Sequence, residues 1–90
     1  SAYNSKRVTV LGEVQDSGSL PFEPGLTLVQ AISLAGGLNA IADADRIKLT
    51  RKTADGSMTV VVSVRAIMDG RSPDIPLQAG DQLYVEDRTF

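Results

Sequence analysis

Residues 26–37 have the sequence LTLVQAISLAGG, which predicts a helix that carries its own start and stop signals. Thr27 can act as the N-cap, and Gln30 can reach back to the backbone N–H of that cap to complete a capping box. Gly36 and Gly37 can end the helix, because glycine adopts the left-handed conformation without a Cβ clash. The apolar stripe of the helix comprises Leu28, Ala31, Ile32 and Ala35. A helix of roughly three turns is too short to be stable alone, so the rest of the chain must cover this stripe.

The segments on either side of the helix have the patterns of strands. A hairpin is expected before it, where Gly12 in the middle of a strand predicts a bulge or a close backbone neighbour. After it comes a loop over 38–44, then an alternating strand and a return strand joined at Asp55-Gly56, a pair typical of hairpin turns. A short helix over 63–68, with Ser63 as its cap, precedes the last strand. The expected strands are residues 7–14, 19–22, 46–52, 58–62 and 82–85.

This order of elements predicts an α+β domain of the β-grasp type. A mixed sheet of about five strands would pack on one main helix, with a second short helix beside it. An SH3-like or OB barrel fits less well, because the best-marked helix would then have no structural role. The expected domain spans residues 8–86, with an extended N-terminal segment at 1–7 and a C-terminal tail at 87–90.

The composition limits the possible functions. The formal net charge is −2, which argues against nucleic acid as the main partner. The chain has no cysteine and no histidine, so it lacks thiolate metal ligands and the commonest general base. No segment approaches the ~20 apolar residues of a membrane span. The chain begins at Ser1-Ala2 without methionine or a signal-peptide pattern, so we expect it to be a piece of a longer protein.

Four motifs, in this order along the chain, resemble the soluble-ligand-binding β-grasp (SLBB) domain. They are TVLGEV at 9–14 with its return strand at 18–22, PGLTL at 24–28, AISLAGG at 31–37 and LQAGDQLYV at 77–85. The nearest resemblance is to the SLBB domains of outer-membrane polysaccharide export proteins, whose "PExxF" ending is similar to EDRTF at 86–90. Ser17 and Ala79 depart from this pattern, in which proline is common at both positions.

The resemblance implies a function in transport. The domain would be periplasmic, as part of an outer-membrane-associated protein of a Gram-negative bacterium. It would contribute to a multimeric channel that exports capsular polysaccharide or exopolysaccharide. Its partners would be other subunits or domains of the same export protein, with the polysaccharide itself as a candidate, and no cofactor is implied. The same domain type occurs in other bacterial assemblies and in cobalamin carriers, so a module that recognises a glycan or small molecule directly is the alternative.

One basic cluster and one aromatic residue are the candidate contact residues. The cluster comprises Arg46, Lys48, Arg51 and Lys52, and alternation places Arg46, Lys48 and Lys52 on one exposed strand face. These cations could steer an acidic glycan or meet an acidic patch on a neighbouring subunit. The plainer interpretation is a solvated face that discourages edge pairing. Tyr84 is either a core residue or a contact on a strand face.

Other polar motifs favour structural roles. Asp43 and Asp45 form a carboxylate pair, but a calcium loop needs more oxygen donors at regular spacing, so a polar loop is favoured. Gly36 and Gly37 follow a helix, whereas phosphate loops precede one. The serines have no histidine base, and no Ser-Lys pair stands in a recognisable motif. We therefore expect no catalytic, metal-binding or cofactor-binding residues and no enzymatic activity.

Overall fold

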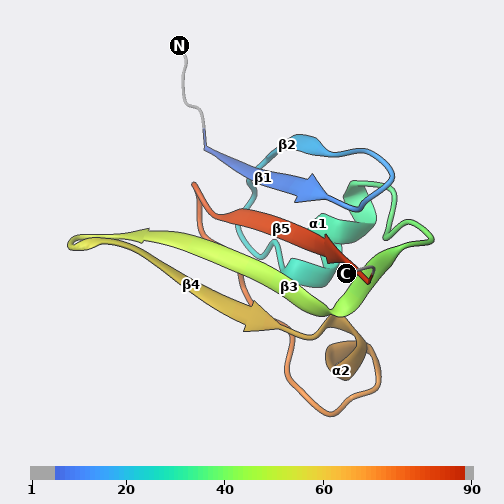
Figure 1. Cartoon of the computed structure of the whole chain (residues 1–90). Coiled ribbons are helices and arrows are strands. Elements are labelled where there is room, and N and C mark those ends of the chain that lie inside the picture. The colour runs from blue at the N-terminus through green and yellow to red at the C-terminus, as the bar shows by residue number, and fades with distance from the viewer. Residues whose placement is uncertain (1–5, 89–90) are drawn as a thin grey trace.

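The computed structural model describes residues 6–88, and its elements follow the expected order. Five strands form one mixed sheet in the order β2-β1-β5-β3-β4, in which β1 and β5 are parallel and the other neighbours antiparallel (Figure 1). The predicted α+β fold, with a mixed sheet and two helices, is confirmed. The elements are β1 (Arg7–Gly12), β2 (Gly18–Pro21), α1 (Leu28–Leu34), β3 (Ala42–Thr53), β4 (Gly56–Val62), α2 (Val64–Met68) and β5 (Gln82–Asp87).

Helix α1 has the predicted caps at both ends. The Thr27 hydroxyl accepts a hydrogen bond from the Gln30 backbone N–H, and the Gln30 side-chain oxygen accepts one from the Thr27 N–H, both at 3.3 Å. Gly36 and Gly37 follow the helix with φ of +86° and +88°. The Gly37 N–H donates to the Ile32 carbonyl at 2.9 Å, which satisfies a carbonyl at the end of the helix.

The core lies between α1 and one face of the sheet, which we call the inner face. All four residues of the predicted apolar stripe are buried there. The strands supply alternate side chains to the same cluster, as expected for a sheet with one covered face. The buried strand residues are Val8, Val10, Ile47, Leu49, Leu83 and Val85. Figure 1 shows α1 on this side of β1, β5 and β3, while α2 lies near the start of β3 and directly after the end of β4.

Gly12 is required by the close approach of β1 to β5. Its φ is +91°, and a Cβ built there would lie 2.2 Å from the Val85 carbonyl oxygen. The next residue, Glu13, donates its N–H to the same oxygen at 3.0 Å. The predicted close backbone neighbour is therefore confirmed, and it joins the first strand of the chain to the last.

Several element boundaries differ from the prediction. β1 ends at Gly12 rather than Val14, because the chain turns there and Val14 instead forms an isolated bridge with Leu38. β3 begins at Ala42, within the predicted loop, because Ala42 pairs with Asp87 at the far end of β5. The register shifts between Ala42 and Ile47, so this part of β3 has no simple alternation that a sequence pattern could show.

The two helices have seven and five residues, and none among residues 6–88 is long enough to cross a membrane. Ser63 caps α2 as predicted, since its hydroxyl accepts from the Ala66 N–H at 3.0 Å. Residues 1–5 of the predicted extended segment and 89–90 of the predicted tail lie outside the described residues.

Candidate interaction surface

The sheet face opposite α1, which we call the outer face, has no helix packed on it within residues 6–88 (Figure 1). Its side chains alternate with the buried ones along each strand. Most are polar, and most are exposed or half-buried. They are Thr9 and Leu11 on β1, Gln82, Tyr84 and Glu86 on β5, Arg46, Lys48, Thr50 and Lys52 on β3, and Ser57, Thr59 and Val61 on β4.

Tyr84 lies at the centre of this outer face. The strand register places it beside Leu11 of β1 on one side and Lys48 of β3 on the other, with Val61 next to Lys48. Tyr84 is 45% exposed, so it is a surface residue and not part of the core. An aromatic ring beside an aliphatic residue and a cation can support contacts to a flat, partly polar partner.

The predicted basic face is present, but acidic Glu86 neutralises part of it. Lys48 Nζ lies 3.2 Å from Glu86 Oε2, and Arg46 Nε lies 3.9 Å from Glu86 Oε1. Glu86 Oε2 is buried and accepts no hydrogen bond within the described residues, so its contact with Lys48 is an ion pair without directed hydrogen bonding. Lys52 stands four residues beyond Lys48 and forms no ion pair within residues 6–88.

Arg51, the fourth cation of the predicted basic cluster, has a different role. It lies on the same side of β3 as Ile47 and Leu49 and pairs with Asp81, whose side chain is 1% exposed. Arg51 Nε donates to Asp81 Oδ1 at 3.0 Å and Nη2 donates to Oδ2 at 2.8 Å. The Gln78 N–H also donates to Oδ2, at 2.8 Å. The hydrogen bonds that Arg51 donates to Asp81 raise the pKa of its guanidinium above the ordinary value, an effect that burial opposes.

The acidic pair in the first part of β3 is structural. Asp43 accepts a hydrogen bond from the backbone N–H of Asp45 at 3.0 Å. Asp45 in turn accepts from the Ser63 hydroxyl at 2.7 Å and lies 3.5 Å from Arg65 Nε. These contacts tie β3 to the start of α2. Within residues 6–88 there is no group of three acidic side chains that could hold a metal ion.

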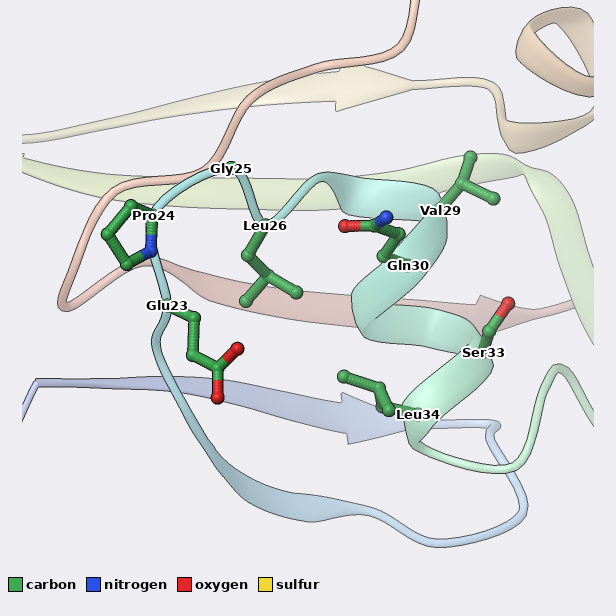
Figure 2. A pocket seen from close by; sticks show the side chains of 8 residues that line it. All are labelled: Glu23, Pro24, Gly25, Leu26, Val29, Gln30, Ser33 and Leu34. Atoms are coloured by element: carbon green, nitrogen blue, oxygen red, sulfur yellow. The ribbon is translucent and has the colours of Figure 1, made fainter.

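A hollow that the sequence patterns did not reveal lies beside α1. It has a volume of about 510 Å³, and Figure 2 shows the Glu23 and Leu34 side chains extending toward each other across it. Leu34 is exposed because it lies off the apolar stripe of the helix. A leucine outside that stripe is the one sequence signal that could have indicated this hollow. Its lining residues are Glu23, Pro24, Gly25, Leu26, Val29, Gln30, Ser33 and Leu34. Among these lining residues, only Gln30 and Ser33 have side-chain hydrogen-bond donors.

Comparison with known proteins identifies the family. The family model of the SLBB domain matches residues 7–62. The chain belongs to the SLBB domain family. It is 41% identical over 91 aligned positions to the EPS I polysaccharide export outer membrane protein EpsA of Ralstonia nicotianae, and 38% identical over 91 positions to the protein of the same name from Ralstonia solanacearum. Each alignment covers 97% of the chain and 23% of the relative.

A third relative matches a shorter stretch of the chain. The exopolysaccharide production protein ExoF of Rhizobium meliloti is 37% identical over 59 residues, which cover 66% of the chain and 14% of ExoF. The chain thus spans about a quarter of the length of the EpsA proteins. The names of the two EpsA relatives describe export proteins of the outer membrane.

Proposed function

We propose that this SLBB domain is a periplasmic interaction module of a polysaccharide export protein and contributes to a multimeric export channel. The observation that carries the proposal is the 41% identity to the export protein EpsA across 97% of the chain. The domain would be one of several segments of the full protein. The work of such a module is assembly and passage of the polymer rather than covalent chemistry.

The open outer face supports this proposal physically. Residues that pair across neighbouring strands form rows on this face. The middle row is wholly polar and comprises Thr9, Gln82, Thr50 and Thr59, and the next row is centred on Tyr84. Obligate interfaces are more apolar than this. A polar face with one aromatic centre suits contacts that stay hydrated, either with a neighbouring subunit or with a passing polysaccharide.

A domain exchange in EpsA tests the proposal. The segment of Ralstonia nicotianae EpsA that aligns with this chain is replaced by residues 1–90, and secreted EPS I is measured in a strain that lacks its own EpsA. We expect the chimera to restore secretion. The matched control carries Ile32→Asp, which places a charge on the buried stripe of α1 and unfolds the exchanged domain.

Two results would contradict the proposal. One is full secretion from the Ile32→Asp chimera, which would mean that a folded domain is not needed at this place. The other is a wild-type chimera that reaches the outer membrane in normal amount and secretes nothing. Immunoblots of membrane fractions separate this second result from simple loss of the protein.

The position of Tyr84 favours direct glycan contact as the second candidate function. The residues concerned are Arg46, Lys48, Lys52 and Tyr84, all on the outer face. An NMR titration of the isotope-labelled chain with acidic and neutral oligosaccharides from the host polysaccharide tests it. Shifts that centre on Tyr84 and Lys48, and that Tyr84→Ala abolishes, would establish glycan contact. Met68→Ala is the matched control, because Met68 is exposed on α2 away from this face. An absence of shifts at millimolar sugar would leave contact between subunits as the role of this face.

A further inference from the structure

Strand β4 is an unprotected edge of the sheet. It pairs with β3 on one side and, within residues 6–88, with no strand on the other (Figure 1). Its seven residues, GSMTVVV, contain no charge and no proline. Edge strands of monomeric proteins normally carry such features to prevent pairing with another chain. The opposite edge, β2, has this protection, because it has four residues and contains Pro21.

The side chains of β4 are also unusually exposed. Met58 is 47% exposed, Val60 is 38% exposed and Val61 is 59% exposed. Three of the seven exposed large apolar side chains in the described part of the chain therefore lie on this one strand. Met58 and Val60 face the same side as the core, but they stand opposite Arg51 and Leu49 near the end of the hairpin and remain outside the buried cluster. A partner strand would cover them.

The hairpin geometry shows which backbone groups of β4 are free. Thr53 pairs with Gly56 across a loop of two residues, and such a closing pair is a hydrogen-bonded pair. Hydrogen-bonded and non-hydrogen-bonded pairs then alternate along the ladder. The residues of β4 in non-hydrogen-bonded pairs are Ser57, Thr59 and Val61, opposite Lys52, Thr50 and Lys48. Their N–H and C=O groups therefore point away from β3, toward the open edge.

We infer that β4 pairs with β4 of a second copy of this chain, antiparallel and with Thr59 opposite Thr59. This register places Ser57 opposite Val61 of the partner and uses every outward backbone group of the three residues. It also sets Met58 beside Val60 of the partner on the inner face and Val60 beside Met58, so the exposed apolar side chains cover each other. The two-fold axis is normal to the sheet, so both outer faces lie on the same side of one continuous sheet.

A second copy is the occupant that fits the strand best. β4 has no charge to attract a charged segment. In the self-paired register Met58 faces Val60 and Thr59 faces its own copy, so like faces like at the three central positions. The β2 edge of another copy is too short and has Pro21. A single strand pair buries far less than the roughly 800 Å² per partner of a standard interface, so the dimer is weak, with Kd on the order of 0.1–1 mM. The inference does not depend on the proposed export function.

A dilution series of the ¹⁵N-labelled 90-residue chain tests the inference. Amide shifts of residues 57–61 should change with concentration between about 0.05 and 2 mM, a range set by the expected Kd. Thr59→Lys places two lysines directly opposite each other in the dimer and should weaken association at least about tenfold. Gln82→Lys is the matched control, because it adds the same charge to the same row of the outer face, two strands from the edge.

A mixture of charged variants makes the test specific for the register. Thr59→Lys and Thr59→Glu should each associate at least about tenfold more weakly than the wild type when alone. Mixed in equal amounts they should associate more strongly than either does alone, because opposite charges then face each other. Dispersed amide spectra of each variant show that it is folded. The inference is overturned if shifts do not depend on concentration up to 2 mM, if they map to β2 or around Tyr84, or if Thr59→Lys associates as the wild type does. It is also overturned if the mixture associates no more strongly than either variant alone.

Discussion

Replacing Arg51 with alanine should destabilise the domain, because the Asp81 carboxylate would remain buried without its counter-charge. Asp81 is 1% exposed, and its two oxygens accept the paired hydrogen bonds of the Arg51 guanidinium at 3.0 and 2.8 Å. Only the Gln78 N–H would then remain as a donor to this carboxylate within the described residues. The pair also connects β3 to the turn before β5, where the Thr9 N–H donates to the Asp81 carbonyl.

The expected loss is about 2–4 kcal/mol in the free energy of unfolding. Removing one partner of a buried ion pair costs about 3–5 kcal/mol, because it leaves an uncompensated charge. The Arg51 side chain is 25% exposed, so water already screens part of its attraction to Asp81 and the expected loss of stability is smaller. A 90-residue domain has a total stability of roughly 5–13 kcal/mol, so the variant should still fold under native conditions.

Urea unfolding followed by circular dichroism measures this loss. Arg71→Ala is the matched control, because Arg71 also pairs with an aspartate, Asp69, but at 3.2 Å and with 64% of its side chain exposed. Arg71→Ala should lower the free energy of unfolding by only about 0–1 kcal/mol. Arg51→Lys keeps the charge without the paired geometry and should lie between the two. Equal losses below about 1 kcal/mol for Arg51→Ala and Arg71→Ala would refute the argument that burial makes the first pair important.

The contribution of Arg51 should not depend on pH between 6 and 10. Its pKa is raised in the folded state, mainly by the hydrogen bonds that its guanidinium donates to Asp81. The stabilisation from a raised pKa is complete below the unfolded value and is lost only as the pH rises through the folded value. Both values are strongly alkaline for arginine. The difference in unfolding free energy between the wild type and Arg51→Ala should therefore be the same at pH 6 and pH 10, and a fall at pH 10 would contradict the assignment.

Other substitutions test the core, the strand contact and the helix cap, each by thermal and urea unfolding. Ile32→Asp buries an unpaired charge on α1 and should abolish the folded circular dichroism spectrum; an unchanged melt would mean that the buried face is misassigned. Gly12→Ala should cost more than about 2 kcal/mol, because its Cβ would lie 2.2 Å from the Val85 carbonyl oxygen. Gly37→Ala is its control, since φ is similar but the space is open, and a cost of about 1–2 kcal/mol is expected from backbone strain alone. Thr27→Ala removes the N-cap and should cost about 1 kcal/mol, whereas Thr27→Ser should restore most of it.

The features that the sequence predicted correctly depend on neighbours within a few residues. The capping box needs only Thr27 and Gln30, three positions apart, and the glycine stop follows directly after the helix. The β3–β4 hairpin is likewise signalled locally by Asp55-Gly56, although its turn is tighter than expected, since Thr53 already pairs with Gly56. The alternation of Ile47 and Leu49 with polar residues correctly placed the inner and outer sides of β3. Local chemistry of this kind determines which elements form and which side of each is buried.

The features that sequence patterns missed depend on contacts between distant segments. Arg51 looked like a member of a basic surface cluster, and its partner Asp81 lies 30 residues away in a turn that the sequence shows only as Gly80-Asp81. The early start of β3 at Ala42 depends on pairing with Asp87, which becomes available only once β5 is in place between β1 and β3. Neither pairing leaves a periodic signal, so neither could be read from hydrophobic alternation.

The two open surfaces of this domain differ in a way that separates their roles. The outer face is mainly polar, and Glu86 offsets part of the charge of Arg46 and Lys48, so this face can stay exposed to water without a partner. The β4 edge has unpaired backbone groups and exposed apolar side chains with no charge to protect them. Pairing with another strand would satisfy these backbone groups and bury these side chains, whereas the outer face does not need a partner to cover it. Tyr84 lies two strands away from the β4 edge, so Tyr84→Ala should remove glycan contact and leave self-association unchanged. Loss of both through this one change would show that the two surfaces act as one.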